Sequence, residues 1–258
     1  MTAPSPHDEI RDDVASVGEP IDVDPVPVAT AATESDRAAI DAGLSRVVLF
    51  DFDGVLIHAD AFGLFVRDRY RHSLLRKLLV LTALPWLLLG LLASWRRPVR
   101  TLVHISLLGV GEQRYAAAAK RFAAQLVRRP RLFSRAGLLA LRRHQAAGDR
   151  VIVVTGCEQT LVSSILQELG LSNIEVLASQ LRPSWLGMRV KSHNVGKRKL
   201  QELAAHGLRT WRVAYTDSSQ DIPMLKPAAE AVLVNGTPTL CKKIEKALGR
   251  SVTRVEWF

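Results

Sequence analysis

Short apolar runs alternate with amphipathic stretches along most of the chain. The runs are rich in Val, Ile and Leu, as in RVVLF before Asp51, which is typical of strands buried on both faces of a parallel sheet. Between them apolar residues recur at the spacing of a helix face. We therefore expect strands at 46–51, 150–155, 174–178, 212–216 and 231–234, and helices at 135–147, 158–169, 197–206 and 238–248.

This order predicts an α/β fold, a Rossmann-like doubly wound parallel sheet covered by helices on both faces. Residues 179–192 contain Pro183 and Gly187 and are expected to project as a hairpin. Residues 58–134 show no strand pattern, which indicates an inserted helical cap. The core then consists of residues 46–57 and 135–258.

The cap contains an unusually apolar segment, LLVLTALPWLLLGLLASW at 78–95, with basic residues on both sides. A membrane-spanning helix needs about 20 apolar residues. A helix that is apolar all round needs protein or lipid on every side, and a cap of this size offers little protein. The pattern favours membrane contact over the alternative, a cap helix buried within the protein.

Polar residues follow three of the predicted strands. The carboxyl ends of parallel strands share one edge of a sheet, where ligands of such folds bind. An Asp-Gly turn without chemistry is the alternative for the first of these positions, but the recurrence along the chain favours a site. Its candidate residues are Asp51 and Asp53, Thr155 and Gly156, Asp217 and Asp221, and Lys197 or Lys199 at the start of a helix.

These positions also limit how the apolar segment can meet a membrane. They lie on both sides of residues 78–95, so an odd number of crossings would divide the site between the two sides of the bilayer. The apolar stretch at 101–111 is too short to return across it. We expect Pro85 to turn the chain, giving two arms of about ten residues that enter one leaflet and come back. Interfacial and spanning arrangements remain open.

Charge is unevenly distributed. Residues 1–45 carry ten acidic and two basic side chains, and the remainder carries 15 acidic and 33 basic ones. The first segment is expected to be a disordered acidic tail. The basic remainder suits an anionic lipid or substrate, whereas no aromatic and arginine pattern indicates nucleic-acid binding, and no feature points to a protein partner.

The two cysteines, Cys157 and Cys241, and the absence of a basic and apolar leader favour a cytoplasmic location for the core. Cys157 follows Gly156 directly. We interpret it as a small buried residue and not as a nucleophile, because no histidine stands beside it in the sequence.

The motifs resemble those of the haloacid dehalogenase superfamily, subfamily IB, over roughly residues 46–240. The similarity lies in DFDGV at 51–55, Thr155-Gly156, the GxxKxxxL pattern from Gly196 to Leu203, and the DxxxD pattern from Asp217 to Asp221. The third pattern favours Lys199 over Lys197. Position 55 is Val where many members have Thr, and the pattern admits either.

This resemblance implies a Mg²⁺-dependent phosphatase. Asp51 is expected to be the nucleophile and Asp53 the general acid and base, with Thr155, Gly156 and Lys199 holding the phosphate. Mg²⁺ would be bound by the side chains of Asp51 and Asp217 and the backbone carbonyl of Asp53. Asp221 is expected to orient Lys199 or water at the metal.

A finer resemblance, to the phosphatidylglycerophosphatase C group, lies in residues 60–63, the apolar segment, residues 178–180 and YTDSSQDIPML at 215–225. It implies removal of the terminal phosphate from phosphatidylglycerophosphate on the cytoplasmic face of a bacterial inner membrane. Asp60 is expected either to bond glycerol hydroxyls or to cap a helix. The alternatives are a soluble cytoplasmic phosphatase of the phosphoserine type and a membrane-bound regulator without turnover.

Overall fold

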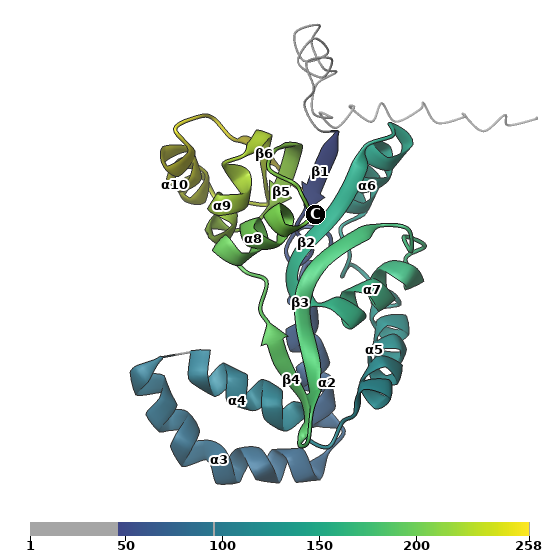
Figure 1. Cartoon of the computed structure of the whole chain (residues 1–258), viewed down its shortest axis with the longest axis vertical. Coiled ribbons are helices and arrows are strands. Elements are labelled where there is room, and N and C mark those ends of the chain that lie inside the picture. The colour runs from purple at the N-terminus through teal and green to yellow at the C-terminus, as the bar shows by residue number, and fades with distance from the viewer. Residues whose placement is uncertain (1–45, 95, 258) are drawn as a thin grey trace, which may run out of the picture.

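A mostly parallel seven-stranded sheet runs through the part of the chain that the computed structural model describes, residues 46–94 and 96–257 (Figure 1). Neighbouring strands are parallel except β3 and β4, which form an antiparallel hairpin. The predicted acidic tail, 1–45, lies outside the described residues. In sheet order the strands are β4 (Gly187–Ser192), β3 (Glu175–Ser184), β2 (Arg150–Glu158), β1 (Val47–Phe50), β5 (Trp211–Thr216), β6 (Ala228–Val234) and β7 (Thr253–Val255).

The central strand β1 is buried on both faces, which explains its unbroken apolar sequence. Val48 and Phe50 belong to one hydrophobic cluster, and Val47 and Leu49 belong to another on the opposite face. Side chains alternate across a strand, so two layers of helices are needed to cover them. The first layer includes α6 (Arg135–Ala146) and α7 (Gln159–Glu168), and the second α8 (Lys197–Ala205), α9 (Ile222–Leu225) and α10 (Pro238–Leu248).

The predicted α/β class is therefore confirmed, as are the positions of the predicted strands, core helices and hairpin. Strands β2 and β3 extend further than expected, through Glu158 and Ser184. The edge strand β7 was missed, because its sequence, TRV, has no apolar run to mark it.

Between β1 and β2 the structure contains α2 (Ala61–Arg71), α3 (Leu74–Ala93), α4 (Arg96–Ser106) and α5 (Glu112–Val127). Helices α2 and α5 pack on the core. The rings of Phe65 and Phe122 meet edge to face at 5.4 Å, and the Tyr115 hydroxyl donates a hydrogen bond to Glu158 at the end of β2. Helices α3 and α4 extend away from the sheet (Figure 1).

The expected turn at Pro85 is wrong. Helix α3 continues through Pro85 as one element that starts with Ser73 as its N-cap and ends at Ala93. A proline inside a helix removes one backbone hydrogen bond and bends the helix, but the surrounding leucines are good helix formers, and the helix in Figure 1 curves without breaking.

The chain returns through α4, which begins earlier than the stretch at 101–111 judged too short for this purpose. The Tyr70 hydroxyl at the end of α2 donates to the Leu102 carbonyl of α4 at 2.6 Å. The side chain of Arg69 donates to the Ser106 carbonyl. The beginning of α3 and the end of α4 therefore lie close together, and the two helices form a hairpin.

Helix α3 packs against α4, but most of its surface is not covered by protein. Among the described residues, Leu74–Leu92 is the one helical segment long and apolar enough to cross a membrane, with a mean hydropathy of 1.8, and 6% of it is buried. A core helix of a soluble protein would be mostly buried. Leucines along the whole helix are exposed, from Leu74 to Leu92.

Candidate active site

The carboxyl ends of β2, β1 and β5 meet beside the first turn of α8. The strand order reverses at β1, because the chain continues from β1 to β2 on one side and later returns to β5 on the other. Ligands of open α/β sheets bind at such a point. A cavity of about 440 Å³ opens at this place. Of the predicted site residues Asp51, Asp53, Asp60, Gly156, Lys199, Asp217 and Asp221 line it, and Thr155 lies just beneath Gly156 in the strand.

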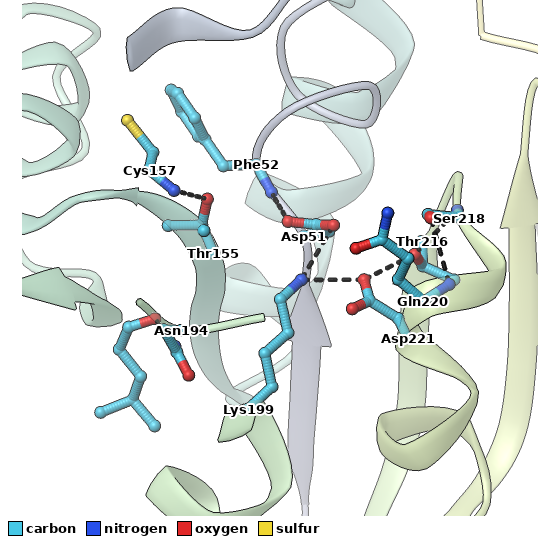
Figure 2. Close-up of polar contacts among 12 residues, drawn as sticks. Asp51, Phe52, Thr155, Cys157, Asn194, Lys199, Thr216, Ser218, Gln220 and Asp221 are labelled. Atoms are coloured by element: carbon cyan, nitrogen blue, oxygen red, sulfur yellow. Dashed lines mark hydrogen bonds and ion pairs between the residues drawn. The ribbon is translucent and has the colours of Figure 1, made fainter. Parts of the chain in front are cut away.

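Lys199 joins the two ends of the site (Figure 2). Its Nζ lies 2.9 Å from Asp51 Oδ2 and 2.8 Å from Asp221 Oδ2. Burial alone would lower the pKa of Lys199, but the two carboxylates outweigh burial and raise it. The amine therefore stays charged. Lys197 is exposed on the same helix, so the structure places Lys199, not Lys197, in the cavity.

Asp221 is held by a second contact that fixes where it can point. The Thr216 hydroxyl at the end of β5 donates to Asp221 Oδ2 at 2.8 Å. The same oxygen accepts the bond from Lys199, so the amine is held between Asp221 and Asp51 (Figure 2). Asp221 therefore contacts Lys199, one of the two groups that it is expected to orient, and its role in the reaction stays a prediction.

Asp53 is set apart from Asp51 by its environment. Burial raises the pKa of Asp53 to about 7, and the nearby Asp60 adds to the effect, whereas a hydrogen bond from the Ala61 amide at 2.9 Å opposes it. A carboxyl with this pKa exchanges protons near neutral pH, as a general acid and base must. The bond to Ala61 aims the side chain along the start of α2.

Burial also raises the pKa of Asp51, although the charge of Lys199 opposes this shift. Burial raises the pKa of Asp217 as well, and the charge of Asp221 adds to the effect. Asp51 Oδ1 accepts a hydrogen bond from the Phe52 amide at 2.7 Å, which leaves Oδ2 towards Lys199. Asp217 packs against Gly54: a Cβ at Gly54 would lie 1.9 Å from Asp217 Oδ2. The missing side chain lets Asp217 approach the loop after β1.

At the end of β2 the chain leaves its regular pairing with β3 between Val154 and Glu158. The Thr155 hydroxyl accepts a hydrogen bond from the Cys157 amide at 2.9 Å (Figure 2). Cys157 is buried in the apolar core, and burial raises the pKa of its thiol, which suits a structural residue. Gly156, in this irregular part of β2, lines the cavity.

Asp60 has one of the two roles expected for it, that of a helix cap, whereas a bond to glycerol hydroxyls stays a prediction. Its Oδ1 accepts a hydrogen bond from the Gly63 amide at 2.8 Å, so it is the N-cap of α2. It also lines the cavity. The cap holds one carboxylate oxygen and thereby fixes the side chain at the edge of the site.

Sequence reasoning missed several residues in and around the site, among them Ser179 and Gln220. The Ser179 hydroxyl donates to the Gly156 carbonyl at 2.7 Å and accepts from the Asn194 amide at 2.9 Å, so it ties the irregular last part of β2 to the segment leading into α8. Gln220 lines the cavity and extends beside Asp221 (Figure 2). The run at 178–180 was noticed only as a similarity, because a serine within a strand carries no signal of its own.

The donor set fits a divalent cation. Four carboxylates, those of Asp51, Asp53, Asp217 and Asp221, line the cavity with Lys199, and burial raises the pKa of the first three. A hard cation with oxygen ligands would relieve that excess of negative charge. Within the described residues no group of three or more His, Cys, Asp or Glu side chains is placed so that it could hold a metal ion. The predicted ligand set contains only two side chains, those of Asp51 and Asp217, and its third ligand is the backbone carbonyl of Asp53, so it is not a group of three such side chains.

Fold and site together define a doubly wound α/β protein with a carboxylate and lysine centre after its central strand. The chain belongs to the haloacid dehalogenase-like hydrolase family, whose model matches residues 48–226.

Solved structures share this fold at low sequence identity. A Bordetella pertussis Tohama I protein of unknown function has a TM-score of 0.62 and 19% identity over 82% of this chain and 99% of its own. A phosphoserine phosphohydrolase-like protein from Francisella tularensis has a TM-score of 0.53 and 16% identity, covering 83% and 95%. Cytosolic 5'-nucleotidase IIIB bound to cytidine has a TM-score of 0.54 and 11% identity, over 85% of this chain and 83% of its own. At these identities the likeness concerns the fold.

Proposed function

We propose that the protein is a phosphatase that hydrolyses a phosphomonoester through an aspartyl-phosphate intermediate. The observation that carries this proposal is the convergence of Asp51, Lys199 and Asp53 on one cavity, with the amine 2.9 Å from Asp51 and the pKa of Asp53 near 7. This set supplies a nucleophile, a fixed cation and a proton carrier at one place.

The reaction has two steps. An oxygen of Asp51 forms a bond to phosphorus while the bond from phosphorus to the leaving alcohol oxygen breaks, and Asp53 gives that oxygen its proton. Asp53 then takes a proton from water as the water oxygen forms a bond to phosphorus. The bond between phosphorus and the Asp51 oxygen breaks at the same time, which releases inorganic phosphate and restores the Asp51 carboxylate. Lys199 and the Gly156 amide, with the Thr155 hydroxyl, stabilise the charge on the phosphate oxygens.

We propose Mg²⁺ as the cofactor, held by the side chains of Asp51 and Asp217 and the carbonyl of Asp53. When bound, the ion neutralises charge shared by the carboxylates and the phosphate, which allows an anionic nucleophile to approach an anionic substrate.

The pKa shifts give this proposal a test without substrate. The folded protein keeps protons on Asp51, Asp53 and Asp217 to a higher pH than the unfolded chain, so its stability without metal falls as the pH rises through these pKa values, about 7 for Asp53. Mg²⁺ competes with those protons. At a Mg²⁺ concentration 100 times its Kd at pH 8, we expect the Tm to rise by about 5–10 °C at pH 8. The same concentration should raise the Tm by less at pH 6, and calorimetry measures both.

The matched control is Asp217→Asn, which removes one proposed ligand and keeps the size of the side chain. It should lose most of the Mg²⁺-dependent rise in Tm. An equal rise in the variant and in the wild-type protein would contradict the proposed metal site.

We further propose that the substrate is a phosphorylated lipid, most specifically phosphatidylglycerophosphate, which would yield phosphatidylglycerol. Helix α3 supports this, because most of its leucines are exposed, from Leu74 to Leu92. The segment from Arg69 to Gly111 also contains seven Lys and Arg and no Asp or Glu. Apolar surface beside basic residues fits the interface of an anionic bilayer.

The helical hairpin favours an interfacial arrangement on the cytoplasmic face of a bacterial inner membrane. Helices α2 and α4 are tied together beside the core, so α3 leaves and α4 returns on the same side of the membrane. Arg76 and Lys77 at one end of α3 and Arg97 beyond the other end are placed in sequence to meet headgroups at both ends. Helix α3 would then lie within one leaflet, along the membrane plane.

The second candidate is a soluble phosphatase of the phosphoserine type. Asp60 supports it, because this fixed carboxylate at the edge of the cavity suits the ammonium group of serine. The same carboxylate also suits the hydroxyls of glycerol, so Asp60 does not exclude the lipid.

Phosphate release from a panel of substrates separates the two candidates. We expect the purified protein, with Mg²⁺, to hydrolyse phosphatidylglycerophosphate in mixed micelles faster than phosphatidate, and phosphoserine slowest of the three. If phosphoserine is the best substrate in detergent-free solution, the lipid assignment is wrong while the phosphatase assignment stands. If no phosphomonoester is hydrolysed, both fail.

A further inference from the structure

The tip of the β3–β4 hairpin carries the most exposed tryptophan among the described residues. Trp185 lies in the turn between the two strands with 89% of its surface exposed. Burying a tryptophan in water-free surroundings stabilises a contact strongly, and tryptophan prefers the interface between lipid and water because one edge of its ring is polar. An indole left in water at a strand turn therefore points to a binding surface.

The hairpin tip is fixed to the end of α4. The Gly109 amide donates to the Leu186 carbonyl at 2.9 Å, and Leu108 pairs with Gly187 as an isolated bridge. Gly187 has a φ of +123°, and a Cβ there would lie 2.3 Å from the Leu107 carbonyl oxygen. The glycine thus lets the hairpin approach α4 closely. The turn that carries Trp185 is therefore fixed relative to the hairpin of α3 and α4. The tip of β3 and β4 and the two helices lie at the same end of the molecule (Figure 1).

The charge around the tip identifies the occupant. Arg182, Arg189 and Lys191 are exposed on the two strands, and residues 176–196 include no Asp or Glu. Leu108, also partly exposed, extends the apolar surface next to the turn. An aromatic tip between basic side chains is complementary to an anionic lipid surface.

We infer that the β3–β4 hairpin is a second membrane contact, in which Trp185 enters the interface of a bilayer containing anionic phospholipid. The inference rests on the proposed lipid function. Two contacts, α3 and the hairpin tip, hold the protein in one orientation, whereas α3 alone would leave it free to rotate about the helix axis. The same strand, β3, carries Ser179, which bonds the Gly156 carbonyl at the cavity, so the orientation of the hairpin also sets that of the site.

The test uses the full chain and sedimentation with vesicles of phosphatidylglycerol and phosphatidylcholine. Trp185→Ala should bind the mixed vesicles about tenfold more weakly than the wild-type protein. Leu139→Ala, which removes another exposed apolar side chain, from α6 on the core, should bind like the wild type. Arg182→Gln combined with Lys191→Gln should lose affinity for the mixed vesicles but not for vesicles of phosphatidylcholine alone. Thermal unfolding of each variant checks that it folds.

A second readout places the indole itself. Brominated phosphatidylcholine in the vesicles should quench the fluorescence of the wild-type protein more than that of Trp185→Ala. Unchanged vesicle affinity and unchanged quenching in Trp185→Ala would overturn the inference. So would a change of oligomeric state in that variant on light scattering, which would make the tip an interface between two copies. If the wild-type protein binds vesicles through Trp185 but hydrolyses no lipid phosphate in micelles, the proposed lipid substrate is wrong and the membrane contact at Trp185 stands.

Discussion

Replacing Asp51 by Asn is expected to reduce phosphate release at least about 10⁴-fold, because an amide cannot form the bond to phosphorus and the loss of a nucleophile removes the whole covalent pathway. Asn has nearly the same shape, and Lys199 keeps its bond to Asp221 at 2.8 Å. Steady-state hydrolysis of the best substrate in the panel, under saturating Mg²⁺, measures the loss.

The same variant should not unfold more easily in the absence of metal. Burial raises the pKa of Asp51 despite the nearby Lys199, so the charged carboxylate destabilises the folded state at neutral pH. A neutral side chain relieves this cost, and the Tm without Mg²⁺ should be equal to or above that of the wild-type protein. A large loss of activity together with an unchanged Tm identifies a chemical role and not a structural one.

Asp68→Asn is the matched control, since it removes a carboxylate from α2 outside the cavity. Its activity should remain within about twofold of the wild type.

The comparison of wild type with Asp51→Asn also tests the alternative of a membrane-bound regulator without turnover. A phosphorylated protein that wild type forms and Asp51→Asn does not would dismiss that reading, whereas equal, low phosphate release by both would support it.

The α/β core was predictable because its physical causes are local and repetitive. A strand such as Val47–Phe50, buried on both faces, requires an unbroken apolar run, and the helices that cover it require periodic apolar positions. β7 lacked this signal, since an edge strand needs pairing on one side only and its residues are partly exposed.

The cap was harder to predict, as Pro85 shows. Pro85 is a visible reason to break the helix. The leucines on either side favour its continuation, and so does the packing of α4 against α3, which the sequence does not show. Gly90 illustrates the latter. A Cβ at Gly90 would lie 3.5 Å from Pro98, so the two helices approach closely at this position. Contacts between distant residues override local propensity.

In the site, the sequence order indicated which strand ends would converge, but not how the side chains are oriented. Lys199 and Lys197 are two residues apart and equally charged, and only the direction of the first turn of α8 places Lys199 between Asp51 and Asp221. Ser179 is a clearer case. Its bond to the Gly156 carbonyl depends on the irregular pairing between β2 and β3, which no sequence pattern records.

Gly54→Ala is expected to lower kcat/KM about 100-fold or more, through geometry and not through a lost functional group. Gly54 has a φ of +79°, and a Cβ there would lie 1.9 Å from Asp217 Oδ2 and 2.3 Å from Asp217 Cγ. Because a side chain yields more easily than the backbone, the Asp217 carboxylate must move away from the loop that carries Asp51 and Asp53. A displacement of about 1 Å costs about 100-fold in a positioned site.

The loss should have two components that can be measured separately. The positive φ destabilises any non-glycine residue by about 1–2 kcal/mol, whereas the clash with Asp217 affects only the site. Gly170→Ala isolates the first component, because Gly170 has a φ of +71° and nothing lies within 4 Å of its Cβ position. Both variants should show a similar fall in Tm, and only Gly54→Ala should lose activity and the Mg²⁺-dependent rise in Tm. If Gly54→Ala retains activity within about threefold of Gly170→Ala, then the position of Asp217 is not what the reaction requires, and its proposed role as a metal ligand is wrong.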